Sequence, residues 1–341
     1  MDRKALIAAL EIVKPALATK EIVEQSTSFA FIDGNIIAYN DEISIRHPIP
    51  ELKLKLNGAL KADSLYQLLS KITRDEIEIE ISEKEVLITA GKAHAGLALQ
   101  TEIKLPVDEI AQDIDLKWKK LPNDFCSALD FTTFTCSRDN SKPVLTCVHV
   151  SPDFIESSDD FRMTRHDTKL TGVDFLLPCG SAQVVAKYAV TQVAQDSSWV
   201  HFKNEKDTCI SCRLFEGKFP SATVDKAMKV KGNAFTMPER LMPALDRAGV
   251  FTKLGYAKGA AIDELVSVSI KDKKMRIEAK GSSEWFFEDL TVDYTGDPFS
   301  FGVNPLFLRQ ITEQMKKCFV TNTRLKFESE KWEHVIALRE G

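Results

Sequence analysis

Three stretches of the chain alternate apolar and polar residues on both sides of a short charged turn, which is the pattern of a β-hairpin. They span residues 76–90, 199–213 and 267–279. A short amphipathic helix is predicted before each of them, at a similar distance. The period of roughly 110 residues is the size of a domain and too long for a solenoid unit. The pattern therefore predicts three copies of one domain.

Six amphipathic helices are predicted, two in each third of the chain. The first, residues 2–17, places Leu6, Leu10 and Val13 on one stripe with Lys4 well round from it, and Pro15 is expected to end or kink it. The other five cover residues 61–72, the segment from Pro122, residues 181–190, the segment from Pro238 and residues 305–317. Five of the six present Lys or Arg on the polar face, although a polar helix face is normally only solvated.

The strands between the helices alternate as antiparallel sheets do when one face is solvated. The fold class predicted is therefore α+β, with two helices per domain packed on antiparallel sheets. Residues 105–115 are acidic and poor in strand formers, which indicates a linker. We accordingly expect domains at residues 1–113, 114–229 and 230–341.

Composition is that of an ordinary soluble protein, with 341 residues, 44% hydrophobic and 28% charged. Apolar runs fall far short of the roughly 20 residues that span a bilayer, and the N-terminus has no signal-peptide centre, so we expect a cytoplasmic protein. The net charge of −5 argues against a protein coated in positive charge. A basic strip on an acidic body would give the same sum.

The residues that carry chemistry in other proteins are present without the spacing that chemistry needs. Cys209 and Cys212 form a C-x-x-C, but it lies in a strand pattern without a second ligand pair, which favours structural thiols. His166 stands beside Asp167, yet no elbow-type serine accompanies them. No phosphate-binding glycine loop or H-E-x-x-H occurs. We expect no enzyme activity, no metal and no cofactor.

Three segments in matching order, and a fourth that precedes them in the chain, carry a resemblance to a known family. They are Leu214-Phe-Glu-Gly-Lys-Phe-Pro220, Leu241-Met-Pro-Ala-Leu-Asp-Arg247-Ala, Val292-Asp-Tyr-Thr-Gly296 followed by Phe301-Gly-Val-Asn304-Pro-Leu-Phe307-Leu, and Ser158-Asp-Asp-Phe-Arg-Met163. Together they resemble motifs of the bacterial DNA polymerase III beta subunit, the sliding clamp, over nearly the whole chain. Asp160 and Phe161 stand where that family has Gly and His, and the closing Met-Pro-Met-Arg-Leu is absent. A divergent clamp fits this pattern, as does one that is encoded by a bacteriophage and located in the host cytoplasm.

The resemblance implies a DNA polymerase processivity factor that encircles duplex DNA without reading its sequence. It implies a DNA clamp fold of three repeated domains, closed into a ring as a head-to-tail homodimer, with sheets outside and helices lining the hole. Lys and Arg on the helices would contact phosphates. The residues expected to face DNA are Lys4, Lys14, Lys71, Arg74, Arg138, Lys142, Lys187, Arg240, Arg247, Arg309, Lys316 and Lys317.

The resemblance also implies a hydrophobic groove that takes short linear peptides of the polymerase and of clamp-loader subunits. The residues expected to line it are Leu145, Arg162, Met163, Pro220, Asn304, Phe307, Ile336 and Leu338. For Leu145 and Phe307, ordinary core packing is an equal alternative. At the level of the whole protein, the alternative is a repeat-built interaction scaffold that does not encircle DNA.

Overall fold

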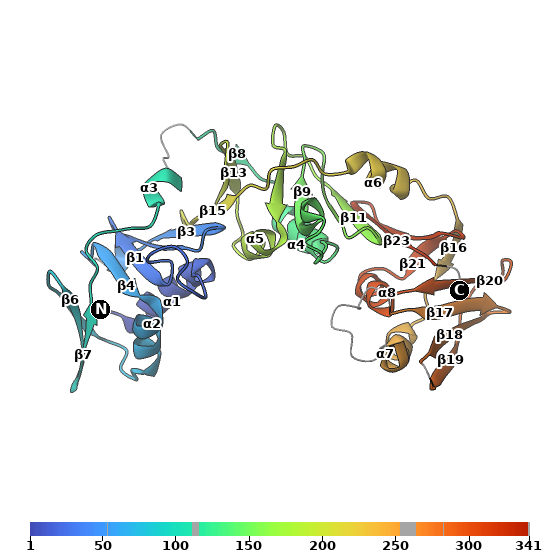
Figure 1. Cartoon of the computed structure of the whole chain (residues 1–341), viewed down its shortest axis with the longest axis horizontal. Helices are drawn as coiled ribbons and strands as arrows, with labels where there is room; N and C mark the ends of the chain where they lie inside the picture. The colour runs from blue at the N-terminus through green and yellow to red at the C-terminus, as the bar shows by residue number, and fades with distance from the viewer. Residues whose placement is uncertain (53, 111–115, 253–263, 282, 340–341) are drawn as a thin grey trace. The chain divides into compact units, whose positions relative to one another are not determined.

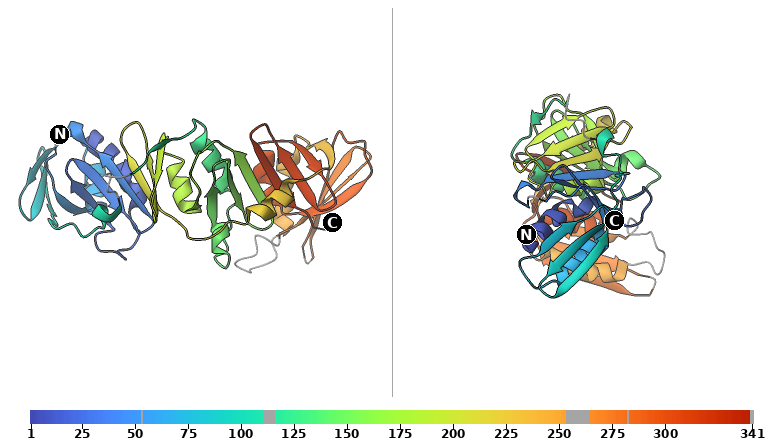
Figure 2. Two further views of the ribbon diagram at one scale, coloured as in Figure 1. Left: turned by 90° about the horizontal axis from the view of Figure 1, so that it is seen from above. Right: turned by 90° about the vertical axis from the view of Figure 1, so that its left-hand side faces the viewer.

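The structure is a computed structural model that describes residues 1–52, 54–110, 116–252, 264–281 and 283–339. The chain divides into two compact units, of which the first contains residues 1–131 and 170–216 and the second contains residues 132–169 and 217–341. Figure 1 shows their elements, and Figure 2 shows them from two further directions. Within the described residues, no helix is long and apolar enough to cross a membrane.

One order of elements occurs three times in the described residues: a helix, four strands, a helix and three strands. The first copy is α1 (Arg3–Val13), β1 (Ser28–Ile32), β2 (Asn35–Tyr39), β3 (Ile43–Pro48), β4 (Gly58–Lys61), α2 (Ala62–Lys71), β5 (Glu78–Ile81), β6 (Glu85–Ala90) and β7 (Ala93–Ala98). The second is α4 (Phe125–Thr133), β9 (Cys147–Val150), β10 (Phe154–Ser158), β11 (Arg162–Asp167), β12 (Phe175–Pro178), α5 (Cys179–Val185), β13 (Gln192–Gln195), β14 (Trp199–Lys203) and β15 (Cys209–Arg213).

The third copy is α7 (Leu241–Thr252), β17 (Val266–Lys271), β18 (Lys274–Lys280), β19 (Trp285–Thr291), β20 (Phe299–Val303), α8 (Pro305–Thr312), β21 (Lys317–Val320), β22 (Arg324–Glu328) and β23 (Trp332–Ala337). Two connecting segments separate the copies. The first holds α3 (Val107–Ile110) and β8 (Lys119–Lys120), and the second holds α6 (Ser221–Met228) and β16 (Asn233–Thr236). The repeat predicted from the sequence is therefore present, element by element.

Each unit is built on a long antiparallel sheet to which two repeats contribute. In the first unit the strand order is β4-β1-β2-β3-β15-β14-β13-β8, and β3 of the first repeat pairs with β15 of the second. In the second unit β9, β10, β11, β23, β22, β21 and β16 lie side by side in that order, and β11 of the second repeat pairs with β23 of the third. Two smaller sheets complete the units, β5-β6-β7 in the first and β19-β18-β17-β20 in the second.

The amphipathic stripes read from the sequence form the core. Leu6, Leu10 and Val13 of α1 are buried, and α1 packs on β2, β3 and α2 within the first unit. Asp2 caps α1 by accepting hydrogen bonds from the N–H groups of Lys4 and Ala5. As predicted, α1 ends just before Pro15, and a single 3-10 turn, Lys14–Ala16, follows. In the second unit α7 packs on β18 and β19 and against α8. The predicted α+β class is thus confirmed.

The three predicted hairpins form, as β5–β6, β14–β15 and β17–β18, but they do not occupy equivalent places in the repeat. The second corresponds to β6–β7 and β22–β23, whereas the third corresponds to β1–β2 and β9–β10. Alternation identifies a hairpin without saying which hairpin of the domain it is, because all of them pack one face on the same core.

Several predicted boundaries differ from the structure. The helix expected over residues 305–317 ends at Thr312, because Lys317 begins β21 and pairs there with Thr236 of β16. The helix expected from Pro238 begins at Leu241. Helix α6 was not predicted, since its stripe of Val224, Ala227 and Met228 is too short to stand out. The predicted boundary at residue 113 lies outside the described residues, so the three domain ranges stay predictions.

Candidate functional site

The eight residues predicted to bind a peptide all lie in the second unit. Arg162 and Met163 begin β11, where the register places them opposite Ile336 and Val335 of β23. The other positions are Leu145 in the 3-10 turn before β9, Pro220 directly before α6, Asn304 and Phe307 at the start of α8, and Leu338 directly after β23.

Arg162 is the central charge of this region and is itself buried, with 5% of its surface exposed. Its Nε donates to Asp159 Oδ2 at 2.9 Å, its Nη2 donates to the carbonyl oxygen of Phe134 at 2.8 Å, and its Nη1 donates to the side chain of Gln310. Its guanidinium also lies 4.1 Å from the ring centre of Phe307. A buried charge is tolerated only when it is paired and hydrogen-bonded, and Arg162 meets both conditions.

The contact between Arg162 and α8 depends on how that helix begins. Asn304 Oδ1 accepts hydrogen bonds from the N–H groups of Leu306 at 2.8 Å and Phe307 at 3.4 Å, and Pro305 takes the first helical position. This cap fixes the first turn of α8 and directs the Phe307 ring onto Arg162. Asn304 and Phe307 are therefore buried, with 4% and 7% of their surfaces exposed.

The turn before β11 contains one residue in the left-handed backbone conformation, which glycine adopts readily. Asp160, which replaces the glycine of the family pattern, has a φ of 73°. Aspartate is one of the few side chains that tolerate this left-handed conformation. Lys142 forms an ion pair with the Asp160 carboxylate. Asp160 therefore adopts a conformation that glycine adopts readily, and its side chain is paired with Lys142.

Pro220 is exposed, and its neighbours on both sides are fixed to the sheet. The ring of Phe219 stacks on that of His149 with centres 5.3 Å apart. The hydroxyl of Ser221 donates to Glu156 Oε1 at 2.6 Å. Pro220 is thus held at the surface by two anchors on β9 and β10.

Glu156 is a buried support of this region that sequence reasoning missed. Its carboxylate has no exposed surface and also bonds His149 at 2.8 Å and Arg165 at 2.5 Å, while Arg165 reaches Asp225 of α6 at 2.7 Å. Burial by itself would raise the pKa of Glu156, but the hydrogen bonds from His149, Ser221 and Arg165 outweigh it and lower the pKa. The charged Glu156 therefore ties α6 to the sheet.

Exposure separates the predicted peptide-binding residues into two groups. Leu145 and Ile336 are buried in the core, with 6% and 0% exposed, as are Arg162, Asn304 and Phe307. Met163 and Leu338 are half-buried, and Pro220 is exposed. Side-chain surface open to a ligand is therefore offered by the last three, and the binding role of the whole set stays a prediction.

The predicted DNA-facing cations of the first unit are all exposed. Lys4 on α1 pairs with Asp75 at 2.9 Å. Lys14 lies over the ring of Tyr66, 3.9 Å from its centre. In the part of the chain that the structure describes, no ion pair involves Lys71, Arg74 or Lys187.

Several predicted cations of the second unit are already neutralised by neighbouring acids. Arg247 of α7 holds Glu288 of β19 through two nitrogens, at 2.9 and 2.6 Å, and Arg309 pairs with Asp246 at 2.9 Å. Lys316 pairs with Glu239 and Lys142 with Asp160. Arg138, Arg240 and Lys317 have no ion pair among the described residues. Lys317 stands on a strand and not on the predicted helix.

The other residues singled out in the sequence have structural surroundings. Cys209 and Cys212 are buried free thiols, and burial raises the pKa of Cys212. His166 Nδ1 bonds the main-chain oxygen of Asp167 rather than its carboxylate. Among the described residues, no group of three or more His, Cys, Asp or Glu side chains is placed to hold a metal ion.

Comparison with solved structures identifies the fold. The chain superposes on the DNA polymerase III beta chain of Streptococcus pneumoniae with a TM-score of 0.83 at 17% identity, covering 100% of this chain and 98% of that one. The Bacillus subtilis DNA polymerase sliding clamp gives 0.81 at 17% identity, and the Pseudomonas aeruginosa clamp bound to griselimycin gives 0.82 at 13%, both with the same coverage.

No family model matches the chain, and no curated protein matches its sequence. The likeness is therefore one of structure, and it extends over the full length of the chain. The chain has the DNA clamp fold of the bacterial DNA polymerase III beta sliding clamps, as the sequence motifs indicated.

The Glu156 network predicts how the second unit responds to acid. The pKa of Glu156 is lower in the folded protein than its ordinary value of 4.5, so its stabilising effect is fully present above pH 4.5 and is lost as the pH falls through the folded pKa. Replacing Glu156 by Gln removes that dependence and lowers the free energy of unfolding at pH 7 by about 2 kcal/mol.

Urea unfolding of both proteins between pH 7 and pH 3, followed by circular dichroism, measures this difference. The matched control is Glu330→Gln, an exposed carboxylate of the same unit. If Glu156→Gln keeps the full acid sensitivity of the unmodified protein, the network does not depend on the Glu156 charge.

Proposed function

We propose that the chain is a DNA polymerase processivity factor, a clamp that encircles duplex DNA as a ring of two copies. The observation that carries this proposal is the threefold repeat of one domain, together with the full-length likeness to bacterial sliding clamps. Such a clamp needs no chemistry, because a closed ring raises processivity by topology and by effective concentration. A scaffold without DNA is not favoured, since nothing in the structure supports it over the clamp.

The internal pairing rule of the chain supports ring closure. The third strand of the first repeat pairs with the last strand of the second, as β3 with β15, and β11 pairs with β23 in the same way. Under this rule the strands that remain are β19, the third strand of its repeat, and β7, the last strand of its repeat. Both are edge strands of their own sheets. A second copy that pairs its β7 with β19, and its β19 with β7, satisfies the rule at all positions and leaves neither edge open.

The two existing junctions also give the register of this third junction. Ser44 lies opposite Ser211, and Met163 lies opposite Val335. The position equivalent to Ser44 and Met163 is Trp285, because each is the first residue paired after a four-residue turn. The partner position is found in the same way, by counting along the hairpin that holds Ser211 or Val335 from the turn that precedes this hairpin. The equivalent position in the first repeat is Gly96.

This register explains two exposed aromatic side chains. Trp285 and Phe287 are 65% and 46% exposed, and their rings stack with centres 5.6 Å apart. In the inferred pairing Trp285 lies across from Gly96, which has no side chain, and Phe287 lies across from His94. In the single chain the Glu85 side chain covers Gly96, so the indole ring packs on the partner strand once this flexible carboxylate moves aside, and both rings leave water.

The inferred register predicts a specific cross-link. Cysteines that replace Trp285 and Gly96 lie directly opposite each other, at the separation a disulfide spans, and mild oxidation should give a covalent dimer of roughly twice 38.2 kDa. The matched control combines Gly96→Cys with Phe287→Cys, two residues out of register, and should cross-link at least tenfold less. Denaturing gels of both variants, with light scattering of the unmodified protein, measure the result. A monomer at micromolar concentration contradicts the ring.

We propose that DNA phosphates are contacted chiefly by the predicted cations without an acidic partner, namely Lys71, Arg74, Arg138, Lys187, Arg240 and Lys317. Changing Lys71, Lys187 and Arg240 together to Glu should weaken binding to duplex DNA and flatten its dependence on salt, because fewer counterions are released. Arg247 is unsuitable for this test, since its loss would also break the bond to Glu288.

Fluorescence anisotropy of a labelled duplex across a salt series measures this effect, and retention on circular against linearised plasmid tests encirclement. The control carries the same three charge changes at exposed Lys169, Lys218 and Lys274, which are not among the predicted DNA-facing cations. Of the three tested cations, Lys71 ends α2, Lys187 follows α5 and Arg240 precedes α7. If both triple variants lose the same affinity for duplex DNA, only the net charge matters and the helices do not face DNA.

We further propose that partner proteins bind by a short apolar peptide that contacts the three predicted residues with open side chains, Met163, Pro220 and Leu338, close to the buried Arg162 network. One sliding clamp of the same fold is bound to griselimycin, which is consistent with a ligand site on this fold. Binding of this kind draws most of its free energy from a few buried contacts.

Replacing Met163 by Ala should therefore weaken peptide binding by about 2 kcal/mol, or roughly thirtyfold, without affecting the dimer. The probes are overlapping peptides of the DNA polymerase encoded in the same genome, titrated by fluorescence anisotropy. Val250→Ala, an exposed apolar side chain on α7, is the control. Unchanged affinity for Met163→Ala, or no binding by any peptide, overturns this site.

A further inference from the structure

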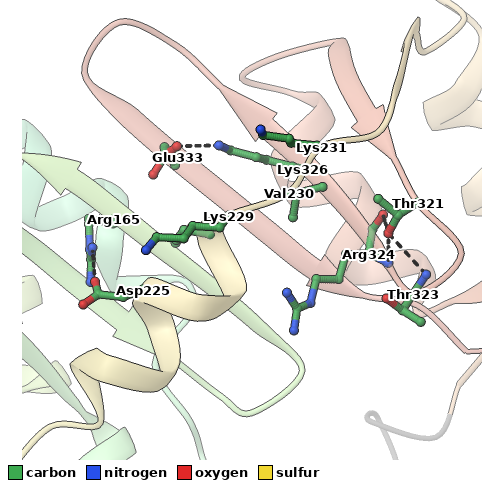
Figure 3. A pocket seen from close by; sticks show the side chains of 11 residues that line it. Arg165, Asp225, Lys229, Val230, Lys231, Thr321, Thr323, Arg324, Lys326 and Glu333 are labelled. Atoms are coloured by element: carbon green, nitrogen blue, oxygen red, sulfur yellow. Dashed lines mark hydrogen bonds and ion pairs between the residues drawn. The ribbon is translucent and has the colours of Figure 1, made fainter.

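A basic pocket of about 850 Å³ lies in the second unit at the C-terminal end of α6. Its wall comes from β11, from the end of α6 and the segment after it, and from the β21–β22 turn, β22 and β23, as Figure 3 shows. Five of its lining residues are cations and two are anions, giving a net charge of +3. The lining residues used below are Arg165, Lys229, Lys231, Arg324 and Lys326.

Two of the five cations are already neutralised. Arg165 bonds both Glu156 and Asp225, and Lys326 bonds Glu333 at 2.5 Å and Glu328 at 2.8 Å. The Arg165–Asp225 and Lys326–Glu333 pairs line two sides of the pocket in Figure 3. They leave no free charge for a ligand.

The other three cations lack an acidic partner. Among residues 132–252, 264–281 and 283–339, no carboxylate forms an ion pair with Lys229, Lys231 or Arg324. Arg324 Nη1 donates to the carbonyl oxygens of Lys226 and Ala227, both at 3.3 Å, so the negative end of α6 holds the guanidinium in place. In the part of the chain that the structure describes, no hydrogen bond is formed by its Nε or Nη2. Three uncompensated charges around one hollow favour an anionic ligand.

The position of the pocket indicates which kind of anion it binds. Met163 and Arg165 lie two residues apart on β11, so their side chains share one face of the sheet about 6.6 Å apart. Helix α6 has Pro220 before its first residue and the pocket at its end. Its eight residues span about 12 Å, a length that four residues of extended peptide cover.

We propose that this pocket binds an acidic polypeptide segment, which lies next to the apolar docking sequence of a partner protein. The role of the pocket in partner recognition rests on the peptide docking proposed above. The affinity of the pocket for an acidic peptide does not depend on that docking. The apolar part of the partner contacts Met163 and Pro220, and its carboxylates lie among Lys229, Lys231 and Arg324. Charge in the flanking sequence then distinguishes partners that share similar apolar residues.

The test uses a fluorescein-labelled hexaglutamate peptide in low salt, with binding followed by anisotropy. Lys229→Glu with Lys231→Glu should weaken binding at least tenfold. The matched control, Lys271→Glu with Lys274→Glu, makes the same charge change on the exposed β17–β18 hairpin of the same unit and should change the affinity less than twofold. Met163→Ala should leave hexaglutamate binding unchanged.

Each outcome decides the proposal. Equal weakening in both double variants, or no binding to the unmodified protein, overturns the pocket. Tighter binding of a labelled oligothymidylate of equal charge, lost in the same double variant, assigns the pocket to nucleic acid and also overturns it. Hexaglutamate binding requires neither a ring nor a polymerase. It is therefore still expected if the clamp proposal fails, so failure of the clamp and failure of the pocket can be told apart.

Discussion

Main-chain hydrogen bonding between successive repeats is the interaction on which the rest of this structure depends. The last hairpin of one repeat extends the sheet that the first hairpin of the previous repeat began, at β3–β15 and again at β11–β23. Each junction satisfies the backbone groups of two strands that would otherwise be sheet edges. The same rule, applied to the edge strands β19 and β7, is the basis on which we propose pairing with a second copy.

The junction between β11 and β23 also carries the candidate peptide site. Arg162 is placed by its backbone pairing with Ile336, and its side chain then collects Asp159, Phe134, Gln310 and Phe307 from three other segments. Removing one partner of so buried a charge is costly, so this cluster fixes the position of α8 relative to the sheet. Met163, the next residue of the same strand, is therefore held on a fixed backbone, so the proposed peptide binding would need little ordering of the protein.

Local ion pairs, rather than the net charge of −5, decide which cations of this protein remain for a ligand. Acids beside Arg247, Arg309 and Lys316 neutralise cations that the sequence alone counts as free. Two sets of candidate cations have no ion pair among the described residues, one on or beside the repeat helices and one around the pocket at the end of α6. Surface ion pairs contribute little to stability, but they decide which positive charges remain for a ligand.

The sequence by itself determined the repeat, the α+β class and most apolar helix stripes, because these depend on the local periodicity of apolar residues. Leu6, Leu10 and Val13 are buried as their spacing requires, and the Asp33-Gly34 turn is left-handed at both residues. The tertiary structure decided which hairpins are equivalent, that Lys317 stands on a strand, and that Glu156 and Gln310 support the site. Those outcomes follow from pairing and contacts between residues far apart in the chain, such as Arg162 with Gln310, and no local pattern encodes them.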